Sequence, residues 1–132
     1  MGYAVGDVVA ERTVHLTRES LVRYAGASGD FNPIHYRDNV ASAVGLPGVL
    51  AHGMLTMGLA SSVVVAELDP RARIVDYGVR FSKPVVVDAE HGADVHVLAT
   101  VGAVDEETTR IDLKVTFGEA TVLVKAQLRV AL

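Results

Sequence analysis

Asp30 and His35 lie five residues apart, in the segment Gly29-Asp30-Phe31-Asn32-Pro33-Ile34-His35. A carboxylate accepts hydrogen bonds, and an imidazole takes up or releases a proton near neutral pH. Held side by side, the two groups can bind a water molecule and remove a proton from it. Residues five apart on a continuous helix point about 140° away from each other, so this chemistry requires a bend. Gly29 and Pro33 predict that bend, because the residue before a proline avoids helical geometry.

The same segment also has a structural interpretation. An aspartate in a Gly-Asp-x-Asn-Pro turn commonly accepts a hydrogen bond from its own backbone, and a histidine that follows a turn is often a surface or capping residue. The spacing of Asp30 and His35 therefore leaves both interpretations open. On either one, the two side chains are expected to be exposed on the turn.

Gly53 begins a second segment of interest, since it follows His52 at the predicted start of a helix without charges. The N-terminus of a helix presents free N–H groups and a partial positive charge, which suits a developing oxyanion. Because glycine has no side chain, a ligand carbonyl could approach the N–H of Gly53. In the alternative interpretation Gly53 only eases a tight turn into the core. His52 is expected to shape the entry into the helix, and a polar role near a substrate stays open for it.

The helix that starts at Gly53 is expected to end before Pro70 and to be buried on nearly all sides, because its first charge is Glu67. The chain before it predicts a strand and two helices: Val8–Leu16, a helix capped by Thr17 that stops near Ser28-Gly29, and a short helix from about Asp38 to Val44. The chain after it predicts antiparallel strands joined by hairpins: Ile74–Val87, Ala93–Val104, Thr108–Phe117 and Thr121–Val130.

These elements predict an α+β fold in which the dry face of a sheet curls round the long helix. A length of 132 residues fits one domain over residues 1–132. Open sheet edges invite pairing with a second subunit, so a dimer is expected.

The composition argues against several classes of protein. The chain has 12 Lys+Arg against 16 Asp+Glu and a formal net charge of −4, whereas a nucleic-acid binder needs a clustered cationic face. Without cysteine it forms no disulfide, which permits a reducing cytoplasm, the expected location. The apolar stretch Met54–Ala66 is short against the roughly 20 residues that span a bilayer, so no membrane segment is expected. The five histidines lack the spacing of a metal-binding motif, and no metal is expected.

The residues from Gly29 to His35, followed by Ala41, resemble the signature of the MaoC-like (R)-specific enoyl-thioester hydratases and dehydratases. The block Ala51-His52-Gly53-Met54-Leu55 and the strand Val79-Arg80-Phe81-Ser82-Lys83-Pro84-Val85 are similar to that family too. Within the family, Tyr24-Ala25-Gly26 and the segment from His52 to Gly58 resemble the B-type subunits of (3R)-hydroxyacyl-acyl-carrier-protein dehydratases of actinobacterial type II fatty-acid synthesis. The resemblance implies the hot-dog fold, in which an antiparallel sheet wraps a long helix.

The resemblance also implies an activity. This is the reversible hydration of trans-2-enoyl thioesters of coenzyme A or acyl-carrier protein to (3R)-3-hydroxyacyl thioesters, with no cofactor. Asp30 and His35 match the catalytic pair that activates water, and Gly53 matches the residue whose N–H meets the thioester oxygen. Asn32 matches the asparagine that orients the loop, and Ser61 matches a serine that approaches the active site in some hydratases.

Other functions and the number of subunits stay open. A hot-dog thioesterase would direct water at the thioester carbonyl instead of Cβ. A subunit of a heterodimeric dehydratase would need a partner chain, and with both Asp30 and His35 this chain would be the catalytic partner. Both a homodimer and a heterodimer with a related hot-dog subunit fit the residues. Arg71, Arg73 and Lys83 could contact the phosphates of coenzyme A or of a pantetheine arm, or could simply be solvated.

Overall fold

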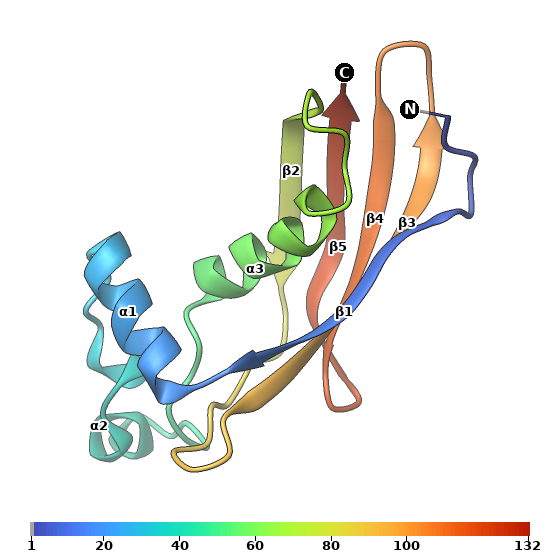
Figure 1. Cartoon of the computed structure of the whole chain (residues 1–132). Coiled ribbons are helices and arrows are strands. Elements are labelled where there is room, and N and C mark those ends of the chain that lie inside the picture. The colour runs from blue at the N-terminus through green and yellow to red at the C-terminus, as the bar shows by residue number, and fades with distance from the viewer. Residues whose placement is uncertain (1) are drawn as a thin grey trace.

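The computed structural model describes residues 2–132; Met1 lies outside the described residues, so the domain expected over residues 1–132 is seen from Gly2 onward. The strands form a five-stranded antiparallel sheet in the order β1-β3-β4-β5-β2, with α3 across one face of it and α1 and α2 beyond its edge (Figure 1). The strands are β1 (Val8–Leu16), β2 (Arg73–Phe81), β3 (Ala93–Val104), β4 (Thr109–Phe117) and β5 (Ala120–Ala131). The helices are α1 (Arg18–Ser28), the 3-10 turn η1 (Pro33–His35), α2 (Asp38–Ala43) and α3 (Gly53–Val65). Between residues 2 and 132, no helix is long and apolar enough to cross a membrane.

Most of the predicted elements are confirmed. β1 and β3 have the predicted bounds, and β4 and β5 begin and end within one residue of theirs. Along β4 the buried Ile111, Leu113 and Val115 alternate with more accessible residues such as the exposed Lys114. This alternation gives the sheet one dry face, which packs into the core with Leu21 of α1 and with buried residues of α3.

The strand predicted over Ile74–Val87 is too long, because β2 ends at Phe81. Pro84 follows shortly after, and a proline has no N–H to donate to a neighbouring strand. The chain therefore leaves the sheet edge, and Val86 pairs instead in an isolated bridge with Leu50.

The hairpin expected between the strands that became β2 and β3 is also wrong. β2 pairs with β5 at one edge of the sheet, whereas β3 pairs with β1 and β4. Residues 82–92, the crossover segment, carry the chain between the two positions. Its buried Val85 and Val87 explain the route, because their backbone groups bond to Ala51 and Val49 (Ala51 N–H to Val85 O 2.9 Å, Val87 N–H to Val49 O 2.9 Å).

Helix α3 is buried on one side only, and the expectation that it would be buried nearly all round is wrong. Its buried residues are Thr56, Ala60, Val63 and Val64. Met54 and Val65 are 59% and 52% exposed. The physical reason is that the sheet covers a single side of the helix, where α3 packs against β1 and β3. The uncharged sequence of α3 therefore leaves one apolar side of the helix that no other described part of this chain covers.

Candidate active site

The bend between Asp30 and His35 forms as the sequence predicts. Helix α1 ends where Gly29 takes a left-handed conformation (φ 77°), and its N–H still donates to the carbonyl of Ala25. Asp30 Oδ1 then accepts from the N–H of Asn32, and Asn32 Oδ1 accepts from the N–H of Ile34, each at 3.2 Å. These two successive side-chain turns start the 3-10 turn η1 and set the direction of His35.

His35 has one ring nitrogen committed to the backbone. Its Nδ1 lies 2.6 Å from the carbonyl oxygen of Leu50, and a carbonyl can only accept, so Nδ1 carries the proton. In the neutral ring Nε2 is then free of a proton and can act as a base. Leu50 is itself held by its N–H bond to the carbonyl of Ile34 at 3.2 Å and by its bridge to Val86.

The two side chains differ in exposure. Asp30 is exposed, as expected, but His35 is only 8% exposed. The expectation that both would be exposed on the turn is therefore wrong for His35. The reason is the ring of His52, which lies 3.8 Å from that of His35 between centroids, at an interplanar angle of 22°.

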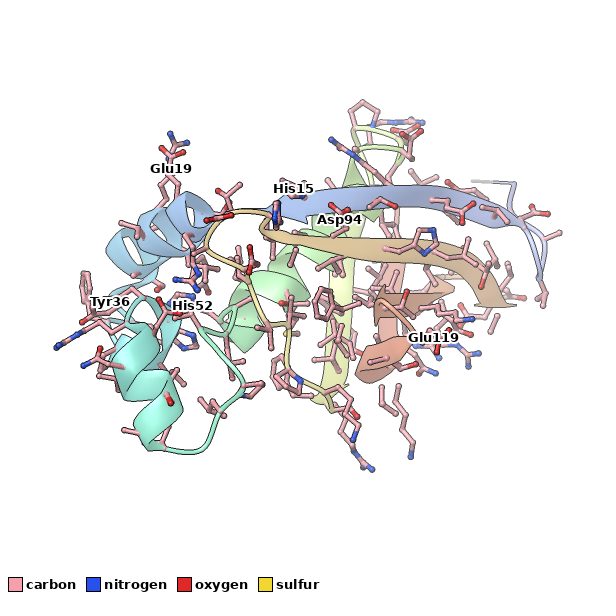
Figure 2. All side chains as sticks on the ribbon, turned by 90° about the horizontal axis from the view of Figure 1, so that it is seen from below. His15, Glu19, Tyr36, His52, Asp94 and Glu119 are labelled. Atoms are coloured by element: carbon pink, nitrogen blue, oxygen red, sulfur yellow. The ribbon has the colours of Figure 1, made fainter. Side chains whose placement is uncertain are left out.

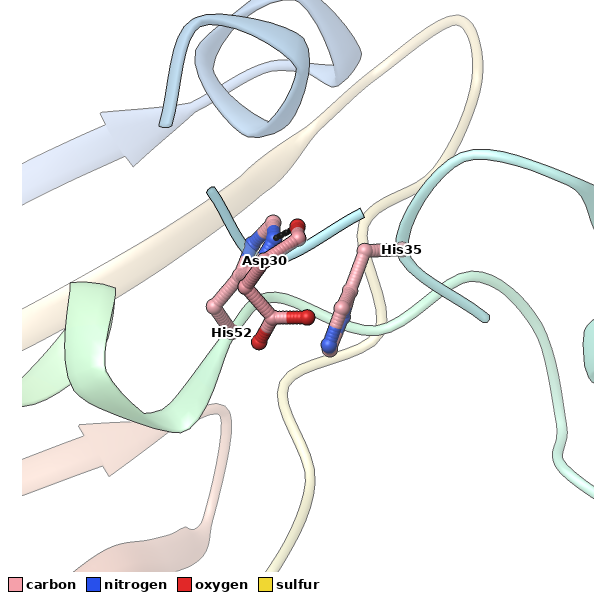
Figure 3. Close-up of side chains that lie close together, drawn as sticks. All are labelled: Asp30, His35 and His52. Carbon is pink, nitrogen blue, oxygen red and sulfur yellow. Dashed lines mark hydrogen bonds between the residues drawn. The ribbon is translucent and has the colours of Figure 1, made fainter. Parts of the chain in front are cut away.

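His52 is buried at the start of α3 (Figure 2), with 1% of its surface exposed. Its Nε2 donates to the carbonyl oxygen of Asp30 at 3.2 Å, drawn as the dashed line in Figure 3. The edge of Tyr24 meets the ring at 4.8 Å between centroids. Burial lowers the pKa of His52 below its usual value, so the ring is neutral near pH 7.

Asp30, His35 and His52 lie close together. One carboxylate oxygen and one ring nitrogen from each histidine lie within 4.8 Å of one another, and Figure 3 shows the Asp30 carboxylate next to the end of the His35 ring. Two hydrogen bonds of about 2.8 Å reach across a separation of that size, so the carboxylate and the His35 ring are near enough to bond to the same water molecule.

The same three residues have the composition of a metal site, but the geometry fits water better. The histidine rings are stacked and nearly parallel, so their in-plane lone pairs do not converge on one ion. Nε2 of His52 is also engaged by the Asp30 carbonyl. The other histidines pair with surface acids, as His15 does with Asp94 at 2.7 Å across β1 and β3 (Figure 2).

A groove of about 320 Å³ opens beside the first turn of α3, and Gly53, Thr56, Phe81, Lys83 and Val85 help to line it. Phe81 lies against Gly53 so closely that a Cβ on the glycine would come within 2.9 Å of the aromatic ring. Only glycine fits here without a shift. The first turn of α3, whose N–H groups have no partner within the helix, therefore lies against a largely apolar groove that Lys83 also helps to line.

Three residues proposed from the sequence lie elsewhere. Ser61 is about 12 Å along the helix from Gly53, and its hydroxyl donates to the carbonyl of Gly58 at 2.9 Å. Arg71 and Arg73 follow the other end of α3. Arg71 pairs with Asp69 at 2.9 Å and lowers the pKa of that carboxyl to about 2, whereas Arg73 begins β2.

The sequence did not single out the Leu50 carbonyl, the Tyr24 edge or the stacking of His52 on His35. Each is a contact between segments that are far apart along the chain, and no local spacing encodes it. The position of His52 directly before Gly53 was the one available signal.

The sheet order and the helix against one sheet face define a hot-dog protein, and the predicted fold is confirmed. The Asp30–His35 pair at the bend gives this protein a site for polar chemistry beside an apolar groove. Residues 4–122 match the model of the family described as MaoC like domain. The chain therefore belongs to the MaoC-like family.

Known proteins similar to this chain support the assignment. It is 40% identical over 80 residues to 3-hydroxyacyl-thioester dehydratase X of Mycobacterium tuberculosis, covering 60% of this chain and 27% of that protein. It is 31% identical over 118 residues to the (R)-specific enoyl-CoA hydratase of Rhodospirillum rubrum, covering 85% of this chain and 82% of the hydratase. The chain thus spans about a quarter of the length of the first relative.

Solved structures have the same fold. A structure described as a MaoC-like dehydratase superposes with a TM-score of 0.93 at 35% identity, over 99% of this chain and 41% of that one. The HadBC complex of M. tuberculosis, described as a 3R-hydroxyacyl-ACP dehydratase, superposes with a TM-score of 0.76 over 98% of both chains. At 18% identity the second likeness concerns the fold alone.

Proposed function

We propose that this chain carries the active site of a hydro-lyase that reversibly hydrates trans-2-enoyl thioesters to (3R)-3-hydroxyacyl thioesters. One observation carries the proposal: a carboxylate oxygen of Asp30 and a ring nitrogen of His35 lie within 4.8 Å of each other beside the N-terminus of α3. The descriptions of the mycobacterial dehydratase and the Rhodospirillum hydratase support it. The reaction would serve fatty-acid synthesis when it removes water and acyl-CoA metabolism when it adds water.

In the hydrating direction, the water molecule between Asp30 and His35 gives a proton to Nε2 of His35. Nδ1 is not available, because it already carries the proton that bonds to Leu50. The oxygen of that water forms a bond to Cβ, and the electron pair of the double bond moves toward the thioester oxygen. The imidazolium, stabilised by the Asp30 carboxylate, then delivers its proton to Cα. Dehydration follows the same steps in reverse.

The charge on the thioester oxygen needs a donor, and Gly53 provides one. Its N–H lies in the first turn of α3, where the helix dipole is positive. One such donor contributes about 3 kcal/mol to the stabilisation of an oxyanion. Asn32 supports the arrangement indirectly by holding the bend through the N–H of Ile34.

The groove along Gly53, Phe81 and Val85 would take the acyl-pantetheine part of the substrate, since it is largely apolar and open. Lys83, an exposed residue that helps to line the groove, would meet a phosphate of coenzyme A or of the carrier-protein arm. We assign no substrate contact within this chain to Ser61, Arg71 or Arg73. We place the reaction in the cytoplasm.

A second subunit would complete the molecule. The uncovered side of α3 exposes Met54 and Val65, and the edge strand β2 exposes Val75 and Phe81 at 51% each. A related chain packed on these residues would bury them, either as a homodimer or as a heterodimer like the HadBC complex.

The proposed function can be tested with the purified chain and crotonyl-CoA, longer enoyl-CoA thioesters and the matching carrier-protein thioesters. Loss of the enoyl absorbance without release of free thiol would support hydration. Release of thiol would instead identify a thioesterase. If neither occurs with the chain alone, the assay is repeated with a related hot-dog subunit, and continued inactivity would refute the proposal.

A further inference from the structure

His52 occupies a position from which it can control the site without touching the substrate. Among the described residues, its Nδ1 is the one buried side-chain polar atom with no hydrogen-bond partner. Its other nitrogen donates to the backbone carbonyl of Asp30, which is 22 residues earlier in the chain. A fully buried ring with a single polar contact is held chiefly by that contact and by the rings around it.

The rings around His52 belong to the site or adjoin it. The face of His52 packs on His35 at 3.8 Å between centroids, and Tyr24 of α1 meets it edge-on at 4.8 Å. The single hydrogen bond reaches Asp30, whose carboxylate would bind the water. His52 therefore contacts both members of the proposed catalytic pair, one through the stack and the other through the backbone.

We infer that His52 is a positioning residue, which fixes the distance between the Asp30 carboxylate and the His35 ring by holding the Asp30 carbonyl while it supports the His35 ring plane. The inference rests on the proposed function, because the distance matters only if the pair activates water. A misplacement of about 1 Å can lower the rate of a catalysed step by about 100-fold.

A direct role in proton transfer does not fit His52. The proton on Nε2 is used by the Asp30 carbonyl, and Nδ1 has no accessible surface from which to reach a substrate. The titratable groups that face the ring are Asp30, His35 and Tyr24. The lowered pKa keeps His52 neutral beside them.

Three variants separate the hydrogen bond from the bulk of the ring. In His52→Gln the side-chain amide nitrogen takes the place of Nε2 and can still donate to Asp30. His52→Phe keeps an aromatic ring on His35 but has no donor, and His52→Leu is a second variant without a donor. Measurements are kcat, KM, the pH dependence of kcat/KM, the unfolding temperature, and the ¹⁵N shifts of His35, which report its tautomer and titration.

We expect His52→Phe and His52→Leu to lower kcat by about 30–100-fold with little change in KM, and His52→Gln to recover kcat to within about 5-fold of wild type. In His52→Gln the pH dependence of kcat/KM should match that of the wild type, because the retained hydrogen bond to Asp30 leaves the catalytic pair in place. The inference would be overturned if His52→Gln lost as much kcat as a folded variant without a donor. It would also be overturned if a folded His52→Phe or His52→Leu kept the wild-type kcat. If neither donorless variant folds, His52→Gln alone decides: a pH dependence of kcat/KM that differs from that of the wild type, or a loss of kcat in proportion to the fraction unfolded, would overturn the inference.

The proposed function and the positioning role of His52 can fail separately. A wild-type chain that hydrates no enoyl thioester, alone or with a partner, refutes the proposed function. The ¹⁵N shifts of His35 still test the position of His52 in that case. Unchanged His35 shifts in a donorless variant would show that the ring of His52 does not set the geometry.

Discussion

The hydrogen bond between Nδ1 of His35 and the carbonyl of Leu50, 2.6 Å long, decides which ring nitrogen can act as a base. It leaves Nε2 for the water and places the ring next to the Asp30 carboxylate. The site thus depends on a backbone group as much as on the two side chains. A conservative substitution should keep that backbone bond while it removes the base.

Asp30→Asn and His35→Asn are such substitutions. An asparagine at position 30 can still accept from the N–H of Asn32, and one at position 35 places an N–H near the position of Nδ1. We expect each to lower kcat by about 10²–10⁴-fold. The free energy of unfolding should change by less than about 1 kcal/mol in Asp30→Asn, since Asp30 is exposed, and should fall further in His35→Asn, which loses the ring stack on His52. Steady-state kinetics and urea unfolding measure the two effects.

His35→Ala is the contrasting variant, because both substitutions remove the ring stack on His52 but only the alanine also loses the bond to Leu50. It should lose more stability than His35→Asn. Turnover at the wild-type rate by any of these variants would contradict the assignment of the pair.

Gly53→Ala tests the donor at the start of α3. The added Cβ would come within 2.9 Å of the Phe81 ring, so the ring or the helix start must shift, and we expect kcat/KM to fall about 10-fold or more. Gly58→Ala is the matched control on the same helix, because nothing lies within 4 Å of its added Cβ. It should keep wild-type kinetics and gain about 0.5–1 kcal/mol in the free energy of unfolding. Equal kinetics in the two variants would count against the role of Gly53.

Asp30, His35 and Gly53 could be proposed from the sequence because each lies in a short local pattern, a turn or a helix start. The burial of His35 could not, because it results from the stack with His52 and from a carbonyl 15 residues away. Local spacing identified the chemical groups and missed the contacts that orient them.

At the scale of elements, Tyr77 of β2 forms a hydrogen bond to α3. The Tyr77 hydroxyl donates to the carbonyl of Met57 at 2.6 Å, and burial raises the pKa of Tyr77 to about 12. Since the usual tyrosine pKa is about 10, the unfolded chain loses this proton more readily than the folded one. The contribution of Tyr77 to stability is therefore complete below pH 10 and is lost as the pH rises through about 12.

Tyr77→Phe should lower the free energy of unfolding by about 1 kcal/mol near neutral pH. Its stability should also fall less steeply than that of the wild type between pH 10 and 12. Chemical unfolding at a series of pH values measures both. Parallel curves for the two proteins would show that Tyr77 is not the group that titrates.

The elements that depend on local patterns were predicted well, as the bounds of β1 and β3 show. The partner of β2 was not, because strand order depends on the route of the crossover segment, where Pro84 and the buried Val85 and Val87 take the chain away from a hairpin. The burial of α3 was overestimated because the absence of charges in a helix does not indicate whether the sheet of the same chain or another subunit covers its apolar sides.

At the scale of the whole molecule, the exposed apolar residues of α3 and β2 predict an association. Val75→Lys places a charge on the β2 edge, where Val75 is 51% exposed, and should shift the protein from dimer toward monomer with loss of activity. Val22→Lys is the control, because Val22 is 59% exposed on α1, away from both elements. Light scattering measures the mass of each variant. A monomeric wild type in the absence of other chains would favour a heterodimer, and a dimeric Val75→Lys would place the interface elsewhere.

The crossover segment connects the groove to the backbone group that orients His35. It contributes Lys83 and Val85 to the groove, and through the bridge of Val86 to Leu50 it also steadies the carbonyl that sets the His35 tautomer. An acyl group long enough to contact the crossover segment would bind more tightly and would also hold the His35 ring more firmly in position. A longer acyl chain should then raise kcat and not only lower KM. A series of chain lengths with constant kcat would show that the groove residues of the crossover segment are not coupled to the Leu50 carbonyl.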